Sequence, residues 1–393
     1  MTHALEKGKC VTMGENKDNP NGKRVRQWAD YNASQTAEKH QVLKLLSELC
    51  KGIQTPGPKS GKPPLDLREI LFCLVFKVYI GRSSRRVNCD FREVRDQGYL
   101  THVPHFNSVS KYLRCRALTP LLKGLIEQSS LPLARVEDCF AVDSTGLSTC
   151  RRRRMYDRHQ RKFRLRREWV KLHAVCGVQT KVITCAEVSK NDVSDQSFFE
   201  YLIRQTAMHF RISEASADAG YHSASHQRLV LILGDIPYIA YKRNSTPYGT
   251  PKSTFWKEML RLFKARHPDF MQHYFKRNNV ESAFHMLKAK FGKHLKCKTW
   301  TGQVNEALCK VLCHNLCVLV HSIYELGLAP EFWENGSSVK KIRRRLKPLR
   351  RHPVPERLEH VFRRISLKKQ PRTLSRSSKA SLRAFRNRRR GTV

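Results

Sequence analysis

The strongest helical pattern in the chain runs from Tyr274 to Gly292. It contains no proline, and its large apolar residues recur at helical spacing: Val280, Phe284, Leu287 and Phe291. At roughly 100° per residue, a second stripe lies about a quarter-turn away and is polar: Tyr274, Arg277, Glu281, His285 and Lys288. We therefore predict an amphipathic helix with one packed face and one charged face.

Helical spacing of apolar residues also marks the stretch from 65 to 130. Asp66 is placed to cap a helix over 67–78, and further helices are predicted at 83–98, from Asn107 to Leu113, and at 120–128. This all-helical unit is either a helix-turn-helix reader of DNA or a helical brace on the next domain, and its sequence leaves both alternatives open.

The pattern changes to β near Arg135. A short apolar strand at 139–142 ends at Asp143, and a later strand at 212–217 ends at Asp218, so two carboxylates leave strand ends. The other predicted elements are strands at 169–178, 182–188 and 237–241 and helices starting at Ser194 and Ser225. Between the first two strands, the stretch 151–167 mixes arginines with aromatic residues, which is typical of a loop along a phosphate backbone.

The pattern divides the chain into five parts. A polar N-terminal segment and linker (1–64) contains one short predicted helix at 37–50. A helical domain (65–130) with DNA binding as one of its two alternatives, an α/β domain (131–300), a packing helix (301–333) and a basic tail (334–393) follow. The packing helix carries Cys309, Cys313 and Cys317 at four-residue spacing, which favours core packing over a zinc site, because one helix cannot easily wrap a tetrahedral ion.

The net charge of the chain indicates the class of partner that it binds. The formal net charge is +42 and the pI is about 10.2, which predicts a polyanionic partner, with DNA or RNA favoured over an anionic membrane. The apolar runs at 70–80 and 311–320 are too short to span a bilayer, so no transmembrane segment is expected. Thirteen cysteines scattered through apolar segments, behind a start without a signal-peptide core, predict reduced thiols and a cytoplasmic protein.

Four residues of the charged face have a recognisable spacing: Tyr274, two residues, Arg277, three residues, Glu281, six residues, Lys288. This spacing resembles the signature of the insertion-sequence DDE transposases, which belong to mobile elements. Two upstream stretches resemble the same family's other catalytic segments: CFAVDSTG around Asp143 and EASADAGYHS around Asp218. The resemblance extends from about residue 65 to residue 333.

The resemblance implies an α/β fold with a ribonuclease-H-like mixed sheet flanked by helices, preceded by an all-helical domain. The run of Arg and Lys that follows lies outside the resemblance, and its composition predicts a disordered basic tail. The resemblance makes Asp143, Asp218 and Glu281 the catalytic residues. Three carboxylates that lie close together stay ionised only beside cations, so the same residues would be the ligands of two Mg²⁺ ions, for which Mn²⁺ would substitute. By the same resemblance, Arg277 and Lys288 would hold phosphate and Tyr274 would order the DNA end.

The implied activity is that of a transposase, which binds the terminal inverted repeats of its element, cleaves there and transfers the 3′ ends to target DNA. Its implied assembly is a homodimer in a paired-end complex, located in the cytoplasm at the nucleoid. Two alternatives stay open at this point. One is a ribonuclease-H-like nuclease without strand transfer, and the other is a DNA-binding relative whose active site has decayed.

Overall fold

The computed structural model describes residues 28–54, 65–157, 162–242, 244–246 and 254–333. All of the described residues belong to one compact unit. The predicted linker at 55–64 and the predicted basic tail at 334–393 lie outside them.

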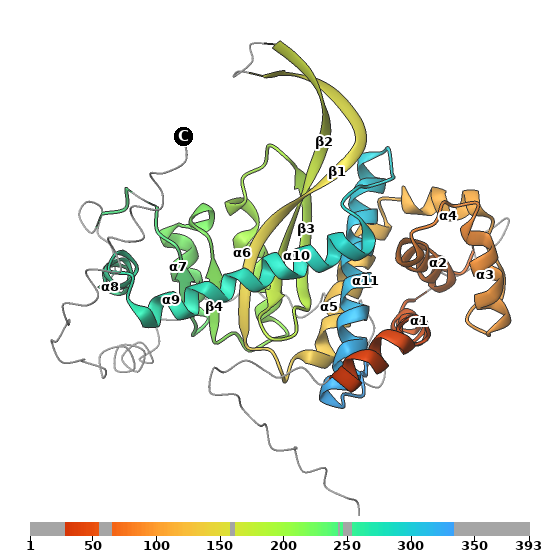
Figure 1. Cartoon of the computed structure of the whole chain (residues 1–393), viewed down its shortest axis with the longest axis horizontal. Coiled ribbons are helices and arrows are strands. Elements are labelled where there is room, and N and C mark those ends of the chain that lie inside the picture. The colour runs from red at the N-terminus through yellow and green to blue at the C-terminus, as the bar shows by residue number, and fades with distance from the viewer. Residues whose placement is uncertain (1–27, 55–64, 158–161, 243, 247–253, 334–393) are drawn as a thin grey trace, which may run out of the picture. The chain divides into compact units, whose positions relative to one another are not determined.

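A five-stranded sheet forms the centre of the described part (Figure 1). Its strands are β1 (Cys139–Asp157), β2 (Lys162–Gly177), β3 (Ile183–Lys190), β4 (Glu214–Ala217) and β5 (Ile236–Ile239). They lie in the order β3-β2-β1-β4-β5. The pairs β1–β2 and β2–β3 are antiparallel, and β4 and β5 run parallel to β1. This mixed sheet with flanking helices confirms the predicted α/β, ribonuclease-H-like fold class.

Helices cover both faces of the sheet. Successive side chains of β1 point to opposite faces, so each face presents apolar residues for helices to cover. Phe140 and Val142 pack with residues of α6 (Gln196–Ala207) and α7 (Ala224–Ile232). Ala141 and Leu147 belong instead to a larger core that includes α5 (Leu118–Ser130), α10 (Asn278–Phe291) and α11 (Trp300–Leu326). Asp143 therefore shares its face with Ala141 and points to the side of α10, whereas Ser144 points to the side of α6.

The N-terminal helices share the larger core. They are α1 (Trp28–Lys51), α2 (Leu67–Ile80), α3 (Val87–Asp96) and α4 (Phe106–Leu113). Asp66 caps α2 as predicted, accepting a 2.9 Å hydrogen bond from the amide of Arg68, and Gly81 ends the helix with a φ of 71°. The short helix predicted at 37–50 is longer than expected, because the polar residues before it continue α1 back to Trp28.

Helix α11 is buried along nearly its whole length and joins the layers through polar side chains. Asn315 pairs with both backbone groups of Ile183 on the edge strand β3, and Asn305 donates to the carbonyls of Leu113 and Cys115. Among the described helices, only α11 is long and apolar enough to cross a membrane. However, 83% of its apolar window is buried in the fold, as in a core helix.

The three cysteines of α11 are buried in this core, which agrees with the packing interpretation. The side chain of Cys313 lies 3.4 Å from the carbonyl of Val75, and burial raises the pKa of Cys317 to about 12. None of the cysteines that the structure describes is in a disulfide.

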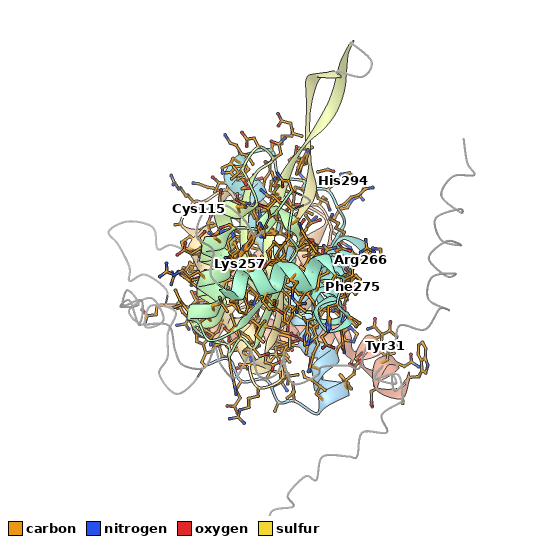
Figure 2. All side chains as sticks on the ribbon, turned by 90° about the vertical axis from the view of Figure 1, so that its left-hand side faces the viewer. Tyr31, Cys115, Lys257, Arg266, Phe275 and His294 are labelled. Atoms are coloured by element: carbon orange, nitrogen blue, oxygen red, sulfur yellow. The ribbon has the colours of Figure 1, made fainter. Side chains whose placement is uncertain are left out.

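The stretch 151–167 was predicted as a loop, and this prediction was wrong. Its described residues continue β1 and β2 as an antiparallel ladder to the pair Asp157 and Lys162. The ladder extends beyond the body of the fold in two views at right angles (Figures 1 and 2). Its residues lack the apolar alternation of a half-buried strand, so the sequence pattern gave no strand signal here.

The single helix predicted from Tyr274 to Gly292 is interrupted near its start. Three elements precede α10: α8 (Thr254–Lys264), α9 (Pro268–Tyr274) and a 3₁₀ turn, η3 (Phe275–Arg277). Tyr274 is the last residue of α9, and Arg277 directly precedes α10. The predicted stripe is present within α10, where Val280, Phe284 and Leu287 are buried.

Candidate active site

The sheet topology places two of the predicted carboxylates side by side. Val142 of β1 pairs with Ala217 of the parallel strand β4, and Asp143 and Asp218 are the next residues on the two strands. Parallel neighbours run in the same direction, so the two carboxylates lie side by side where β4 ends. The predicted strand end at Asp143 was wrong, because β1 continues through this residue to Asp157. Asp218 also begins the short 3₁₀ turn η2 (Ala219–Tyr221), where its Oδ1 accepts a 2.9 Å hydrogen bond from the amide of Gly220.

The third carboxylate reaches the same place from α10. Glu281 lies in the first turn of this helix, and its side chain is 54% exposed. Arg277 joins it to the sheet, because Nη1 of the guanidinium lies 2.7 Å from Oε1 of Glu281 and 3.3 Å from Oδ2 of Asp143. The structure therefore brings Asp143, Asp218, Glu281 and Arg277 together, although they come from separate parts of the sequence.

Asp143 is the most perturbed member of this group. Burial raises the pKa of its carboxyl from an ordinary 3.8 to about 6, helped by the negative charges of Asp218 and Glu281. The amide of Ser144, at 2.7 Å, and the Arg277 guanidinium act in the opposite direction but do not cancel this effect. A buried carboxylate with like charges nearby is a group that a cation would stabilise strongly.

Arg277 responds to the same cluster. Burial alone would lower the pKa of its guanidinium, but the negative charges of Glu281 and Asp143 raise it overall. Its Nε atom is buried and has no hydrogen-bond partner in the structure. Arg277 thus stands between two carboxylates as the cation of the site and keeps one donor unused.

Lys288 extends the site along the sheet. Its Nζ lies 2.5 Å from the hydroxyl of Thr145, which is two residues after Asp143 and therefore on the same face of β1. Burial and the nearby charge of Lys293 lower the pKa of Lys288. The sequence reasoning missed Thr145, although the two-residue period of a strand starting at Asp143 would have indicated it.

Tyr274, the fourth signature residue, belongs to an aromatic cluster. Its ring lies 6.3 Å from those of Phe263 and Phe270 and 5.8 Å from that of Phe275, measured between centroids. His285 is exposed on α10. The role of Tyr274 in ordering a DNA end stays a prediction.

Residues on the other face of the sheet form a separate polar network. Asp195 accepts hydrogen bonds from Ser144 at 3.0 Å and Lys171 at 3.2 Å. His173 is fully buried there, and burial lowers its pKa to about 4, so its ring is neutral at pH 7 and bonds Ser189 at 2.8 Å. This network supports β1 from the side opposite Asp143.

Two sets of contacts fix α10 in place. At its start, Glu214 of β4 forms ion pairs with His273 and Lys276. Burial alone would raise the pKa of Glu214, but the hydrogen bonds from His273, Cys139 and Lys276 outweigh it and lower the pKa to about 2.

At its end, Lys310 of α11 donates to the carbonyls of Gly292 and His294, at 2.7 and 2.8 Å. Glu306 of α11 accepts the amides of Lys296 and Cys297. The segment that follows α10 is therefore held by buried side chains. Sequence analysis did not identify these anchors, because a Glu and a Lys in an apolar helix give no indication of their partners.

The donor set fits a divalent cation, since clustered carboxylate oxygens are the ligands that Mg²⁺ and Mn²⁺ prefer. In the described part of the chain, no three such side chains are arranged in the geometry of a metal site. Arg277 explains the difference, because its guanidinium occupies the position between Asp143 and Glu281 and supplies positive charge there.

The part of the chain that contains the carboxylate group is similar to a known family of domains. Residues 134–316 match the family model of the transposase DDE domain, a range that contains the whole carboxylate group. A solved structure titled "Cryo-EM structure of piggyBac transposase synaptic complex with hairpin DNA (SNHP)" is similar at 12% identity and a TM-score of 0.36. The similarity covers 86% of this chain and 84% of that one. The domain match, over residues that form the mixed sheet and its carboxylate cluster, supports a transposase of the DDE type.

Proposed function

We propose that this protein is a DNA transposase that binds the terminal inverted repeats of its element, cleaves there and transfers the 3′ ends to target DNA. The observation that carries the proposal is the group of Asp143, Asp218 and Glu281, in which Arg277 contacts Asp143 and Glu281, inside the range that matches the transposase DDE domain. A homodimer that pairs two element ends, located at the nucleoid, completes the proposal.

In this proposal, Asp143, Asp218 and Glu281 hold two Mg²⁺ ions, or Mn²⁺ in their place. When bound, the ions supply activation of the attacking oxygen and stabilisation of the leaving oxygen. Arg277 and Lys288 bind phosphate oxygens beside the scissile bond, since both are partly buried cations on the same face as Asp143. Arg277 contributes its unpartnered Nε donor, and Tyr274 packs against the DNA end.

The test uses the full-length protein and DNA from either side of the coding region, where the element's ends would lie. Asp143→Asn, Asp218→Asn and Glu281→Gln keep side-chain shape but remove a charge that metal binding needs. Each should reduce cleavage and joining in Mg²⁺ by orders of magnitude and leave DNA affinity in Ca²⁺ close to that of the wild type. The exposed Asp192→Asn is the matched control and should keep wild-type cleavage.

The outcomes separate the alternatives. Cleavage without joining would favour a nuclease, and binding without cleavage by the wild type would favour a DNA-binding relative. A single carboxylate variant with near-normal cleavage would show that this residue is not a ligand.

A further inference from the structure

The part of the β1–β2 ladder that extends beyond the body is called the arm here, and comprises residues 151–157 and 162–167 (Figures 1 and 2). Of these thirteen residues, eight are Arg or Lys and one is acidic. A short hairpin needs no such charge for solubility, so the composition indicates a polyanion at this position.

The register strengthens this inference. Arg152 is paired with Arg167, and Arg153 is paired with Arg166. Like charges at directly opposed positions destabilise an antiparallel ladder. The arm therefore carries a built-in repulsion, and a bound polyanion would relieve it.

The base of the arm is joined to the candidate active site. A register shift between Ser148 and Arg152 marks the point where the arm leaves the sheet. There the amide of Ser148 donates to the carbonyl of Lys293 at 3.0 Å, and the amide of Leu295 donates to the carbonyl of Ser148 at 2.8 Å. Because α11 holds the same segment after α10, the arm and the catalytic helix share one support.

We propose that the arm is a β-ribbon that enters the major groove of the duplex DNA on which the candidate active site acts. The inference rests on the proposed function. Two strands about 4.8 Å apart, with their side chains, fit a major groove about 12 Å wide but not a minor groove about 6 Å wide. For the arm, a second copy of this chain is the less suitable partner, since both the arm and the chain as a whole are basic.

The spacing along β1 agrees with this arrangement. Arg152 follows Asp143 by nine positions, and nine steps along a strand span at most about 30 Å. One turn of DNA measures about 34 Å, so a single duplex can lie at the carboxylates and receive the arm about one turn away.

The test removes the four opposed charges in one full-length variant, Arg152→Gln, Arg153→Gln, Arg166→Gln and Arg167→Gln. The matched control replaces the same four residues by Lys. The probe is a duplex of about 40 bp, long enough for both contacts at about 34 Å per turn. It is used unmodified and with glucosylated cytosines, which fill the major groove.

Wild type should bind the glucosylated duplex more weakly than the unmodified one, and netropsin in the minor groove should leave binding unchanged. In the Gln variant, affinity should fall, and the slope of log affinity against log salt should flatten by about 3 to 4. The Lys variant should keep the wild-type slope. A second variant, in which Asn-Gly replaces residues 151–167, should lose the same binding and the discrimination between the two duplexes.

The inference would be overturned if the Gln variant and the shortened variant both bound DNA like the wild type. That means the same affinity, the same slope of log affinity against log salt, and the same preference for the unmodified duplex over the glucosylated one. A change in the sedimentation of DNA-free protein with unchanged DNA binding would also overturn it, because the arm would then be a contact between copies. Either result leaves the carboxylate test untouched. By contrast, a wild type that cuts no DNA, with a functional arm, would refute the proposed transposase activity alone.

Discussion

Replacing Asp143 by Asn should make the metal-free protein more stable. The Asp143 side chain is 17% exposed, and its pKa rises from 3.8 to about 6 on folding, chiefly because of burial. The folded chain therefore holds the carboxyl proton more tightly than the unfolded chain does. The stability that the protonated carboxyl provides is complete below pH 3.8 and is lost as the pH rises through about 6.

The difference between 3.8 and about 6 corresponds to about 3 kcal/mol, at about 1.36 kcal/mol per pH unit. Asn removes the buried charge and keeps the shape, and Arg277 retains its 2.7 Å contact with Glu281. We therefore expect Asp143→Asn to raise the free energy of unfolding at pH 8 by up to about 3 kcal/mol. The corresponding rise in Tm is roughly 5 °C for a chain of this size.

The assay is thermal unfolding with chelator at pH 8 and near pH 4, where most of the gain should disappear because Asp143 is then protonated in the wild type. Asp195→Asn is the control. Its carboxylate is paired with Lys171 and Ser144, so this change should destabilise the protein. A loss of stability in Asp143→Asn at pH 8, or a gain that does not depend on pH, would refute the argument.

Three further predictions concern the support of the site. Arg277→Ala should lower cleavage far more than DNA affinity, as kinetics beside binding in Ca²⁺ would show, and equal losses would make Arg277 an ordinary backbone contact. Glu214→Gln should cost up to about 3 kcal/mol at pH 7 in urea unfolding. That cost should shrink as the pH falls from 4.5 through about 2, and a cost independent of pH would contradict the ion-pair explanation. Lys310→Met should destabilise the protein by roughly 2–4 kcal/mol, because two carbonyls lose a charged donor, whereas the exposed Lys257→Met should change little.

The sequence predicted the sheet and α10 well because their burial is periodic. The strand before Asp143, the alternation on β2 and the stripe of α10 follow directly from which residues face the core. The neighbouring positions of Asp143, within β1, and Asp218, directly after β4, then follow from the parallel direction of the two strands. The clustering of these carboxylates was thus predictable once the order of elements suggested a mixed sheet.

Other features had no such signal. The break between α9 and α10 falls among polar residues that suit a helix or a 3₁₀ turn equally well, so helical spacing could not locate it. The contacts of α11 are long-range. Lys310 and Glu306 acquire partners only when the segment after α10 is folded against them, and residue type alone does not identify those partners.

The arm shows why charge and pattern must be considered together. Up to Ser148 the core fixes the register of β1, because a slip by one residue would turn Ala141 and Leu147 out of the core. Beyond the register shift, no buried face enforces the pairing, and the ladder sets arginine opposite arginine. A chain selected only for stability would gain by replacing one member of each pair. That these pairs are present argues that the arm is adapted to a partner whose negative charge offsets the repulsion.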